Sequence, residues 1–134
     1  MPADSLHTTF LRLTPRGSIE KLPLAGFWPQ LMRGELGDFH QEYLVSTAQY
    51  GADWPSWEMH PNGDEIVCLL SGAATMILEA PDGSRSELPL TEPGSFAFVP
   101  RHHWHTAKIS VASSMLFITP GEGTEHRPDV VKPA

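Results

Sequence analysis

Turn-forming residues interrupt this sequence at intervals of about eight to twelve residues, and short apolar runs lie between them. The 134 residues include 13 prolines and 11 glycines, which leave little room for long helices. Regular spacing of this kind is typical of a β-sandwich or a β-barrel. The sequence therefore predicts an all-β protein made of many short strands.

The apolar runs define nine predicted strands. Between the first two of them, Pro23 and Pro29 break any long helix, so this stretch is predicted to be extended or to form one helical turn. Phe96 and Phe98 alternate with small residues and are predicted to face the core. A loose N-terminal segment and a loose tail from about Gly121 are expected at the two ends. The predicted strands are Thr8–Leu13, Gln41–Gln49, Trp54–His60, Glu65–Ser71, Ala73–Glu79, Ser84–Pro89, Ser95–Val99, Trp104–Lys108 and Ser113–Thr119.

The composition argues against several classes of partner. A formal net charge of -7 repels nucleic acid and anionic membrane surfaces, so neither is an expected partner. No apolar run is long enough for a transmembrane helix, and the first residues lack the pattern of a secretory signal. The single cysteine, Cys68, cannot form an internal disulfide. We therefore expect one cytoplasmic domain, residues 1–134, with a barrel core at about 41–119.

The strongest local signal surrounds the Asn-Gly pair at 62–63. Such a pair between two β-prone runs favours a two-residue type I′ hairpin, which would place His60 directly opposite Glu65. Glu58 lies two residues before His60 and would share its face, together with apolar Val67. Burying two carboxylates there is costly unless a cation balances them. The alternative is an exposed face on which these charges are hydrated.

A second group of polar residues follows the strand that ends near residue 99, where three histidines occur within four positions. His105 begins an alternating run and is predicted to point inward, whereas His102 and His103 lie in the turn and are predicted to be exposed. A neutral histidine is a good ligand for a first-row divalent metal. The sequence therefore offers His105 as a further candidate ligand.

The order and spacing of these two segments resemble those of the cupin superfamily. The resemblance covers about residues 57–108. It implies a double-stranded β-helix, or jelly-roll barrel. The matching positions are His60, Glu65 and Gly72 in the first motif and Gly94, Pro100 and His105 in the second.

Carried over position by position, the resemblance implies a divalent metal held by Glu58, His60, Glu65 and His105. The family's usual set is three histidines and one glutamate, so Glu58 is a departure, and His102 stands where the family has glycine. Two imidazoles and two carboxylates balance a divalent ion to zero net charge, whereas the usual set leaves one positive charge. If Glu58 turns away, the other three resemble the facial triad of non-haem iron oxygenases. Fe, Mn, Zn or Ni would suit either set, and a cupin without a metal, with Glu58 as a polar pocket residue, is the alternative.

Two classes of function follow from the resemblance. The first is a small-molecule enzyme that uses the metal, with dioxygenase-like oxidation favoured over isomerisation and Glu58 as a ligand or a base. The second is a non-catalytic small-molecule binding or sensor protein with the same pocket. Small barrels of this type often pair through a sheet edge or an outer sheet face, so a homodimer is expected.

Overall fold

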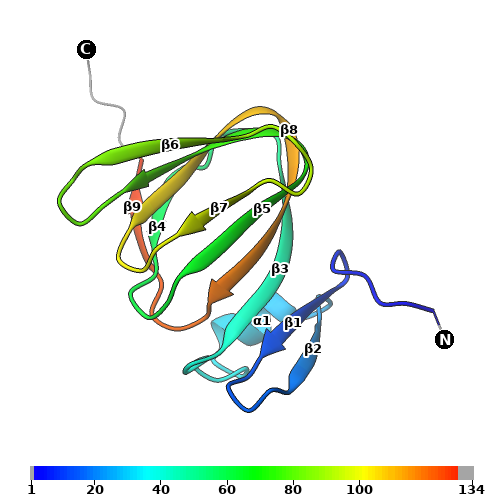
Figure 1. Cartoon of the computed structure of the whole chain (residues 1–134). Helices are drawn as coiled ribbons and strands as arrows, with labels where there is room; N and C mark the ends of the chain where they lie inside the picture. The colour runs from blue at the N-terminus through cyan, green and yellow to red at the C-terminus, as the bar shows by residue number, and fades with distance from the viewer. Residues whose placement is uncertain (1, 130–134) are drawn as a thin grey trace.

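Antiparallel strands make up most of the computed structural model, which describes residues 2–129 (Figure 1). No helix within these residues has the length and apolar character needed to cross a membrane. The elements in chain order are β1 (Thr9–Leu13), β2 (Ile19–Pro23), α1 (Phe27–Met32), β3 (Tyr43–Tyr50), β4 (Ser56–Met59), β5 (Glu65–Glu79), β6 (Arg85–Leu90), β7 (Phe96–Val99), β8 (Trp104–Pro120) and β9 (Glu125–Pro128).

Two long strands, β5 and β8, form the centre of the fold. The sequence predicts each of them as two shorter strands, but in the structure each continues through a bend and the two remain paired with each other. The register of this pairing shifts between Leu69 and Ala74, and Gly72 within that region has a φ of 91°. A register shift of this kind is a β-bulge, in which an extra residue in one strand bends the strand and increases its twist without ending it. The turn-forming residues around Gly72 therefore form a β-bulge within one continuous strand and do not separate two strands.

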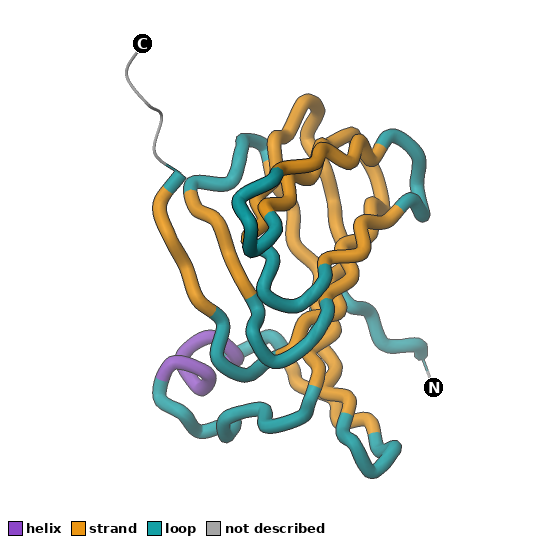
Figure 2. The backbone as a smooth tube through the Cα atoms, turned by 60° about the vertical axis from the view of Figure 1, so that its left-hand side comes forward, coloured by secondary structure: helices purple, strands orange, loops and turns teal. Residues whose placement is uncertain are grey.

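The bend folds the sheet over on itself (Figures 1 and 2). On one side of the bend, β8 lies between β3 and the first half of β5, and β7 and the β1–β2 hairpin extend the sheet outward. On the other side, β8 lies between β4 and the second half of β5, and β9 and β6 extend the sheet. All of these pairs are antiparallel, and the sheet is not closed. The arrangement confirms the predicted jelly-roll fold class.

Alternation along the strands places one set of side chains inside the folded sheet. In β7 the phase of this alternation is the reverse of the prediction. Ala97 and Val99 are buried, whereas Phe96 and Phe98 are 61% and 52% exposed. The core contains Trp54, Val67, Leu69, Ala74, Met76, Leu78, Leu90, Ala97, Val99, Ala107, Met115 and Phe117.

Secondary structure lies near both ends of the described residues. Near the N-terminus, β1 matches its predicted strand, and α1 is a short helix with Pro29 in its first turn, where proline is tolerated. The ring of Phe27 in α1 packs against Phe10 in β1, with 5.1 Å between ring centroids. In the tail, β9 pairs with the whole of β4. Both ends therefore contribute ordered structure beside the barrel core.

The predicted hairpin at 61–64 is wrong as a strand pairing. The structure pairs β4 with β8 and β9, and β5 with β6, β7 and β8, so the two strands that flank the Asn-Gly pair lie apart. Gly63 is not among the glycines with positive φ, and a side chain there would collide with Tyr43 and Pro120. Asn62 donates its side-chain N–H to the carbonyl oxygen of Glu122 in the tail. This segment therefore crosses between two parts of the folded sheet.

Candidate metal centre

The folded sheet brings four polar side chains together from three strands and one loop. Glu58 lies on β4 directly opposite His105 on β8, so their side chains share a face. His60 follows β4 on the same face as Glu58, and Glu65 begins β5 across the interior. His60, Glu65 and His105 are almost completely buried. The structure thus brings together all four residues named in the sequence analysis.

The buried atoms of this cluster converge closely. Oε1 of Glu65 lies 2.8 Å from Nε2 of His105 and 3.4 Å from Nε2 of His60. Both contacts lack hydrogen-bond geometry, so these three buried atoms have no hydrogen-bond partner among the described residues. Buried polar atoms normally have partners, because an unpaired group loses its hydration without compensation. Three such atoms facing one another fit a bound cation.

The outer nitrogen of each histidine is occupied. Nδ1 of His105 lies 3.2 Å from the carbonyl oxygen of His103, which can only accept, so Nδ1 carries the proton. Nδ1 of His60 lies 2.9 Å from the hydroxyl oxygen of Thr124. When Nδ1 donates, a neutral imidazole has its lone pair on Nε2. The hydrogen bonds therefore favour histidine tautomers whose free lone pairs point at Glu65.

The electrostatics of the cluster follow from its burial and its opposite charges. Burial raises the pKa of Glu65, but the imidazoles of His105 and His60 outweigh burial and hold this pKa at about 2, below the ordinary 4.5. Burial lowers the pKa of His105, but the Glu65 carboxylate outweighs it and raises the pKa above 6.5. The second oxygen of Glu65 accepts a 2.6 Å hydrogen bond from the Thr119 hydroxyl. Without a cation, the cluster is therefore held by an imidazolium–carboxylate pair.

The metal-free protein is expected to be most stable between about pH 4.5 and 6.5. The contribution of Glu65 to the free energy of unfolding is present above its ordinary pKa of 4.5 and is lost as the pH falls toward about 2. The contribution of His105 to the free energy of unfolding is present below its ordinary pKa of 6.5 and is lost as the pH rises through its raised pKa. Urea denaturation in a chelator from pH 2.5 to 9 measures this profile. A His105→Gln variant that keeps an undiminished loss of stability above pH 6.5 would contradict the assignment.

Glu58 differs from the other three residues because its side chain is 33% exposed. Its Oε2 lies 4.0 Å from Nε2 of His60, and its Oε1 lies 3.5 Å from Nε2 of His126 on β9. One atom each from Glu58, His60 and His105 lie within 4.8 Å of one another, a grouping that could bind a metal ion. Glu58 therefore lies at the rim of the cluster, close enough to turn toward it or toward His126.

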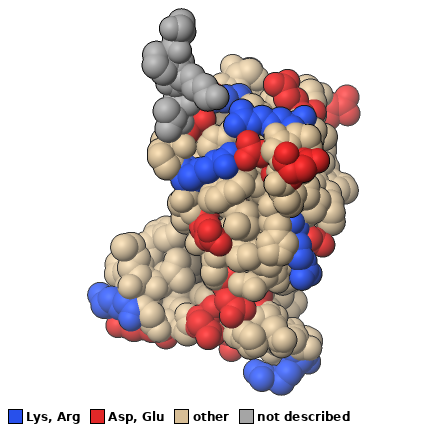
Figure 3. Space-filling view, turned by 90° about the vertical axis from the view of Figure 1, so that its left-hand side faces the viewer, with Lys and Arg blue, Asp and Glu red and all other residues tan. Residues whose placement is uncertain are grey.

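The tail contributes to the site in a way that the sequence does not reveal. Thr124 and His126 reach the site because β9 pairs with β4, and that short polar strand has no apolar alternation that would reveal it. Arg127 anchors β9: its guanidinium lies 4.9 Å from the ring centroid of Trp57 and bonds to Glu79 at 2.8 Å. Figure 3 shows basic and acidic side chains interleaved at the upper end of this face and further charged side chains at its lower end.

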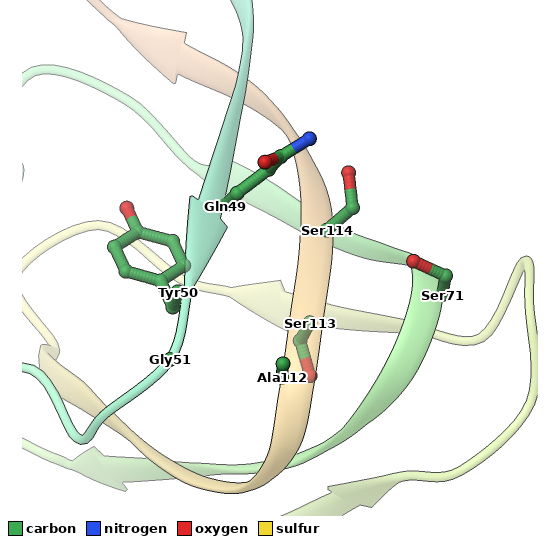
Figure 4. Close-up of a pocket in the computed structure, with 7 residues that line it drawn as sticks. All are labelled: Gln49, Tyr50, Gly51, Ser71, Ala112, Ser113 and Ser114. Carbon is green, nitrogen blue, oxygen red and sulfur yellow. The ribbon is translucent and has the colours of Figure 1, made fainter.

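Two hollows lie near the site. The first, about 260 Å³, is lined by Glu58 and Glu65 together with aromatic and small polar side chains. The second, about 320 Å³, lies where the long strands bend and includes none of the four cluster residues. Tyr50 lines both hollows. The second is bounded by Gln49, Tyr50, Gly51, Ser71, Ala112, Ser113 and Ser114 (Figure 4).

Comparison with solved structures identifies the fold. A hydroquinone 1,2-dioxygenase from Sphingomonas sp. TTNP3, with 4-hydroxybenzoate bound, matches at a TM-score of 0.51 and 14% identity, over 60% of each chain. The Bacillus subtilis oxalate decarboxylase, described with Mn(II) centres, matches at a TM-score of 0.51 and 22% identity, over 66% of this chain and 23% of that one. A cupin-2 domain protein from Shewanella frigidimarina NCIMB 400 matches at a TM-score of 0.46 and 17% identity, over 58% of this chain and 70% of that one.

The matched regions thus span 60% of the dioxygenase chain and a smaller part of the decarboxylase. No protein-family model matches the sequence, and no curated relative matches it. At identities of 14% and 22%, the likeness to the dioxygenase and the decarboxylase defines the fold and leaves the reaction open. The bent sheet, the order of its strands and the two likenesses at a TM-score of 0.51 agree: this chain has the jelly-roll fold that its resemblance to the cupin superfamily predicts.

Proposed function

We propose that this protein binds one divalent metal ion and uses it as a small-molecule enzyme, with dioxygenase-like oxidation as the favoured reaction. The observation that carries the proposal is the convergence of three buried, unpartnered atoms, which are Nε2 of His60, Oε1 of Glu65 and Nε2 of His105. A bound divalent ion would supply Lewis acidity and, if it is iron, the capacity to activate dioxygen.

The surrounding residues have distinct tasks in this proposal. Thr119 holds the Glu65 carboxylate by its second oxygen and leaves the first free to coordinate. Glu58 is the fourth ligand, or it takes a proton from a substrate in the adjoining hollow, which it lines. Its contact with His126 gives the carboxylate a second resting position at the rim. Both tasks of Glu58 suit a site that must open one position to substrate.

Oxygen uptake separates the enzyme from its alternatives. The protein loaded with Fe²⁺ is tested with catechols, thiols and β-diketones, and the proposal expects substrate-dependent oxygen consumption that His105→Gln abolishes. Rearrangement of a substrate without oxygen uptake would identify the isomerase. A metal-loaded protein that binds members of the panel and converts none of them would favour the binding or sensor protein, which the same pocket also suits.

Thr124→Val is expected to weaken metal binding about 10- to 100-fold, the usual effect of losing a group that orients a ligating histidine. The hydroxyl is the hydrogen-bond partner of Nδ1 of His60, and valine preserves its shape while removing that partner. Competition with a chromophoric Zn²⁺ chelator measures the dissociation constant. Thr124→Ser should restore affinity close to the original value, and a valine variant that binds as tightly as the unaltered protein would count against this role.

A homodimer formed through the outer face of β7 and β5 is a second part of the proposal. Phe96 and Phe98 project from this face, and the register places them beside Cys68 and Ile66. Exposed contiguous apolar surface of this kind is typical of an interaction site. Sedimentation velocity should show a dimer that Phe98→Ser converts to a monomer. The matched control is Ile19→Ser, since Ile19 is 62% exposed on β2, and an equal effect of both changes would contradict this interface.

A further inference from the structure

Tyr50 lies between the two hollows and lines both of them. Ser46, Ala48 and Tyr50 alternate along β3, so their side chains share one face of the sheet, and all three line the hollow beside the candidate metal centre. Figure 4 shows the Tyr50 ring on the other side of β3 from Gln49, with its hydroxyl at the end remote from the residues around the bend. The bend hollow thus meets the base of Tyr50, and the hydroxyl points into the interior of the folded sheet, where the ring packs against the core.

The electrostatic environment of the Tyr50 phenol agrees with this direction. Burial, followed by the charges of Glu58 and Glu65, raises the pKa of Tyr50 from its ordinary 10.0 to about 12. Both carboxylates line the same hollow, so the phenol oxygen lies within electrostatic reach of the candidate metal centre. Burial, the largest of these causes, persists when a cation balances the carboxylates. Tyr50 therefore faces the hollow as a neutral O–H donor at ordinary pH.

The hydroxyl of Tyr50 is unpaired and open. No group within residues 2–129 forms a hydrogen bond with it, yet it is not one of the unpaired atoms that are closed to solvent. Tyr43, the other tyrosine of the chain and also on β3, donates its hydroxyl to the carbonyl oxygen of Asp64 at 2.9 Å. Thr47 and Thr119, which line the same hollow as Tyr50, also donate their hydroxyls within the chain. The Tyr50 hydroxyl, by contrast, is available to a ligand.

Neighbouring rings hold the Tyr50 phenol in place. Its ring centroid lies 5.4 Å from that of Trp54 and 6.3 Å from that of Phe117, with the second pair almost perpendicular at 81°. Trp54 in turn lies 6.4 Å from His105, so a chain of ring contacts links the phenol to the cluster. A side chain that is fixed before binding loses little conformational freedom when a ligand arrives. The donor is therefore preorganised.

The rest of the lining determines what can bind beside this hydroxyl. The hollow has a volume of about 260 Å³, below the range of about 300 to 1,000 Å³ of pockets for drug-sized molecules, so it suits a small ligand. Phe10, Trp28 and Phe117 give it apolar walls. Its carboxylates can only accept hydrogen bonds, and no lysine or arginine is among the lining residues that the structure describes. A ligand oxygen away from the metal must therefore take its hydrogen bond from a neutral donor, and Tyr50 presents a rigid one.

We infer that Tyr50 is a substrate-binding residue whose hydroxyl donates a hydrogen bond to a carbonyl or alcohol oxygen of the small molecule in the interior hollow. The inference rests on the proposed function and deepens it, because it assigns a substrate class and the residue that selects it. The substrate is held at two points, by the metal centre and by the Tyr50 hydroxyl. A molecule of the same shape without the oxygen loses the second of these contacts.

NMR of the tyrosine side chains tests this contact directly. The chain has two tyrosines, so protein labelled with ¹³C at the tyrosine Cζ gives two signals, which Tyr50→Phe assigns. The probe is cyclohexanone, whose oxygen can only accept and which has no aromatic ring to shift a signal merely by its proximity. We expect cyclohexanone to move the Cζ signal of Tyr50 and to leave that of Tyr43 in place. Binding without movement of the Tyr50 signal, or no binding of the probe, would overturn the inference.

A pair of variants measures the strength of the contact. Tyr50→Phe keeps the ring and removes the hydroxyl, so the dissociation constant of cyclohexanone should rise about tenfold. That of methylenecyclohexane, which has the same shape and no oxygen, should change by less than twofold. Tyr43→Phe is the matched control and should change neither, because Tyr43 does not line the hollow.

Two results from the variants would contradict the assignment. Equal losses of both probes in Tyr50→Phe would show that Tyr50 acts by packing alone. A larger loss of cyclohexanone in Ser46→Ala than in Tyr50→Phe would assign the donor to Ser46, which lines the same hollow. If Tyr50→Phe fails to fold, the movement of the Cζ signal in the unaltered protein still decides the point, with Tyr43→Phe assigning the signals.

Measurements on the Zn²⁺-loaded protein and on the protein in a chelator separate the failures of the two proposals. We expect the Tyr50 signal to move in both forms, and Zn²⁺ binding is measured independently. A chain that binds no metal but shows the movement in the chelator contradicts the proposed function alone. A chain that binds Zn²⁺ tightly but shows the movement in neither form contradicts the assignment of Tyr50 alone. Cyclohexanone that binds more tightly in the Zn²⁺-loaded form while the Tyr50 signal stays in place would mean that its oxygen binds the metal, and would also overturn that assignment.

Discussion

His105→Gln is expected to abolish stoichiometric metal binding while leaving the fold intact. His105 is fully buried, and its Nε2 lies 2.8 Å from the carboxylate of Glu65, so no neighbouring histidine can take its place. Glutamine fills much of the same space and can donate to Glu65, which limits the loss of stability. Loss of a hydrogen bond to a metal ligand weakens metal binding about 10- to 100-fold. Loss of the ligand itself should have a larger effect, so we expect the affinity for the metal ion to fall by more than about 100-fold.

Metal content after dialysis, together with chelator competition for Zn²⁺, measures this effect. His103→Gln is the matched control, since it changes a histidine two positions away and keeps the backbone carbonyl that bonds to Nδ1 of His105. Circular dichroism confirms that both variants retain the sheet. A His105→Gln protein that still binds one metal ion tightly would remove His105 from the site and with it the basis of the proposed function.

The sequence predicts that the four candidate residues lie close together, and they do, although the predicted hairpin between two of them is wrong. His60 and Glu65 do meet, with 3.4 Å between their nearest polar atoms, but they meet across the folded sheet. The prediction of a hairpin with His60 opposite Glu65 relied on the turn preference of Asn-Gly. In this chain Asn62 bonds to the tail and Gly63 allows close packing. The motif spacing predicts the proximity of these residues because it reflects the whole fold, which a turn preference does not.

One departure from the motif has a backbone explanation. His102 occupies the position at which the resemblance expects glycine, and its φ is 67°, in the left-handed region that favours glycine. Its backbone N–H donates to the carbonyl oxygen of His60 at 3.2 Å. The sequence shows that histidine replaces the motif's glycine at position 102, but it cannot show that the backbone there is left-handed. That contact ties the two motif segments together.

The parts of the structure that could not be predicted are those stabilised by long-range contacts. β9 is short and polar, and β4, Trp57 and Glu79 stabilise it from elsewhere in the chain. The predicted inward direction of Phe96 and Phe98 is wrong. They are the more apolar side chains of β7, but the inward positions beside β5 need small side chains such as Ala97. Local hydrophobicity cannot reveal that an apolar face lies outside the core.

Gly72→Ala is expected to destabilise the protein by about 4 kcal/mol, which is near the upper end for a single substitution. Gly72 lies at the bend of β5 with a φ of 91°, where a side chain is strained. An added methyl group would also overlap the carbonyl oxygen of Ala112 and come within 2.7 Å of the Cα of Ser113. Both neighbours belong to the bend of β8, so neither can move without disturbing the paired strand. Urea denaturation at a fixed pH in a chelator measures the change in the free energy of unfolding.

Gly83→Ala separates the two causes of that destabilisation. Gly83 has nearly the same φ, 88°, but no heavy atom lies within 4 Å of an added methyl group. Its substitution should therefore cost only the backbone strain, about 1 to 2 kcal/mol. The difference between the two variants measures the overlap at the bend, where one half of the sheet folds over to bring Glu65 toward His105. Equal losses from the two substitutions would show that the two bends can separate, and that the close approach of the long strands does not fix the geometry of the site.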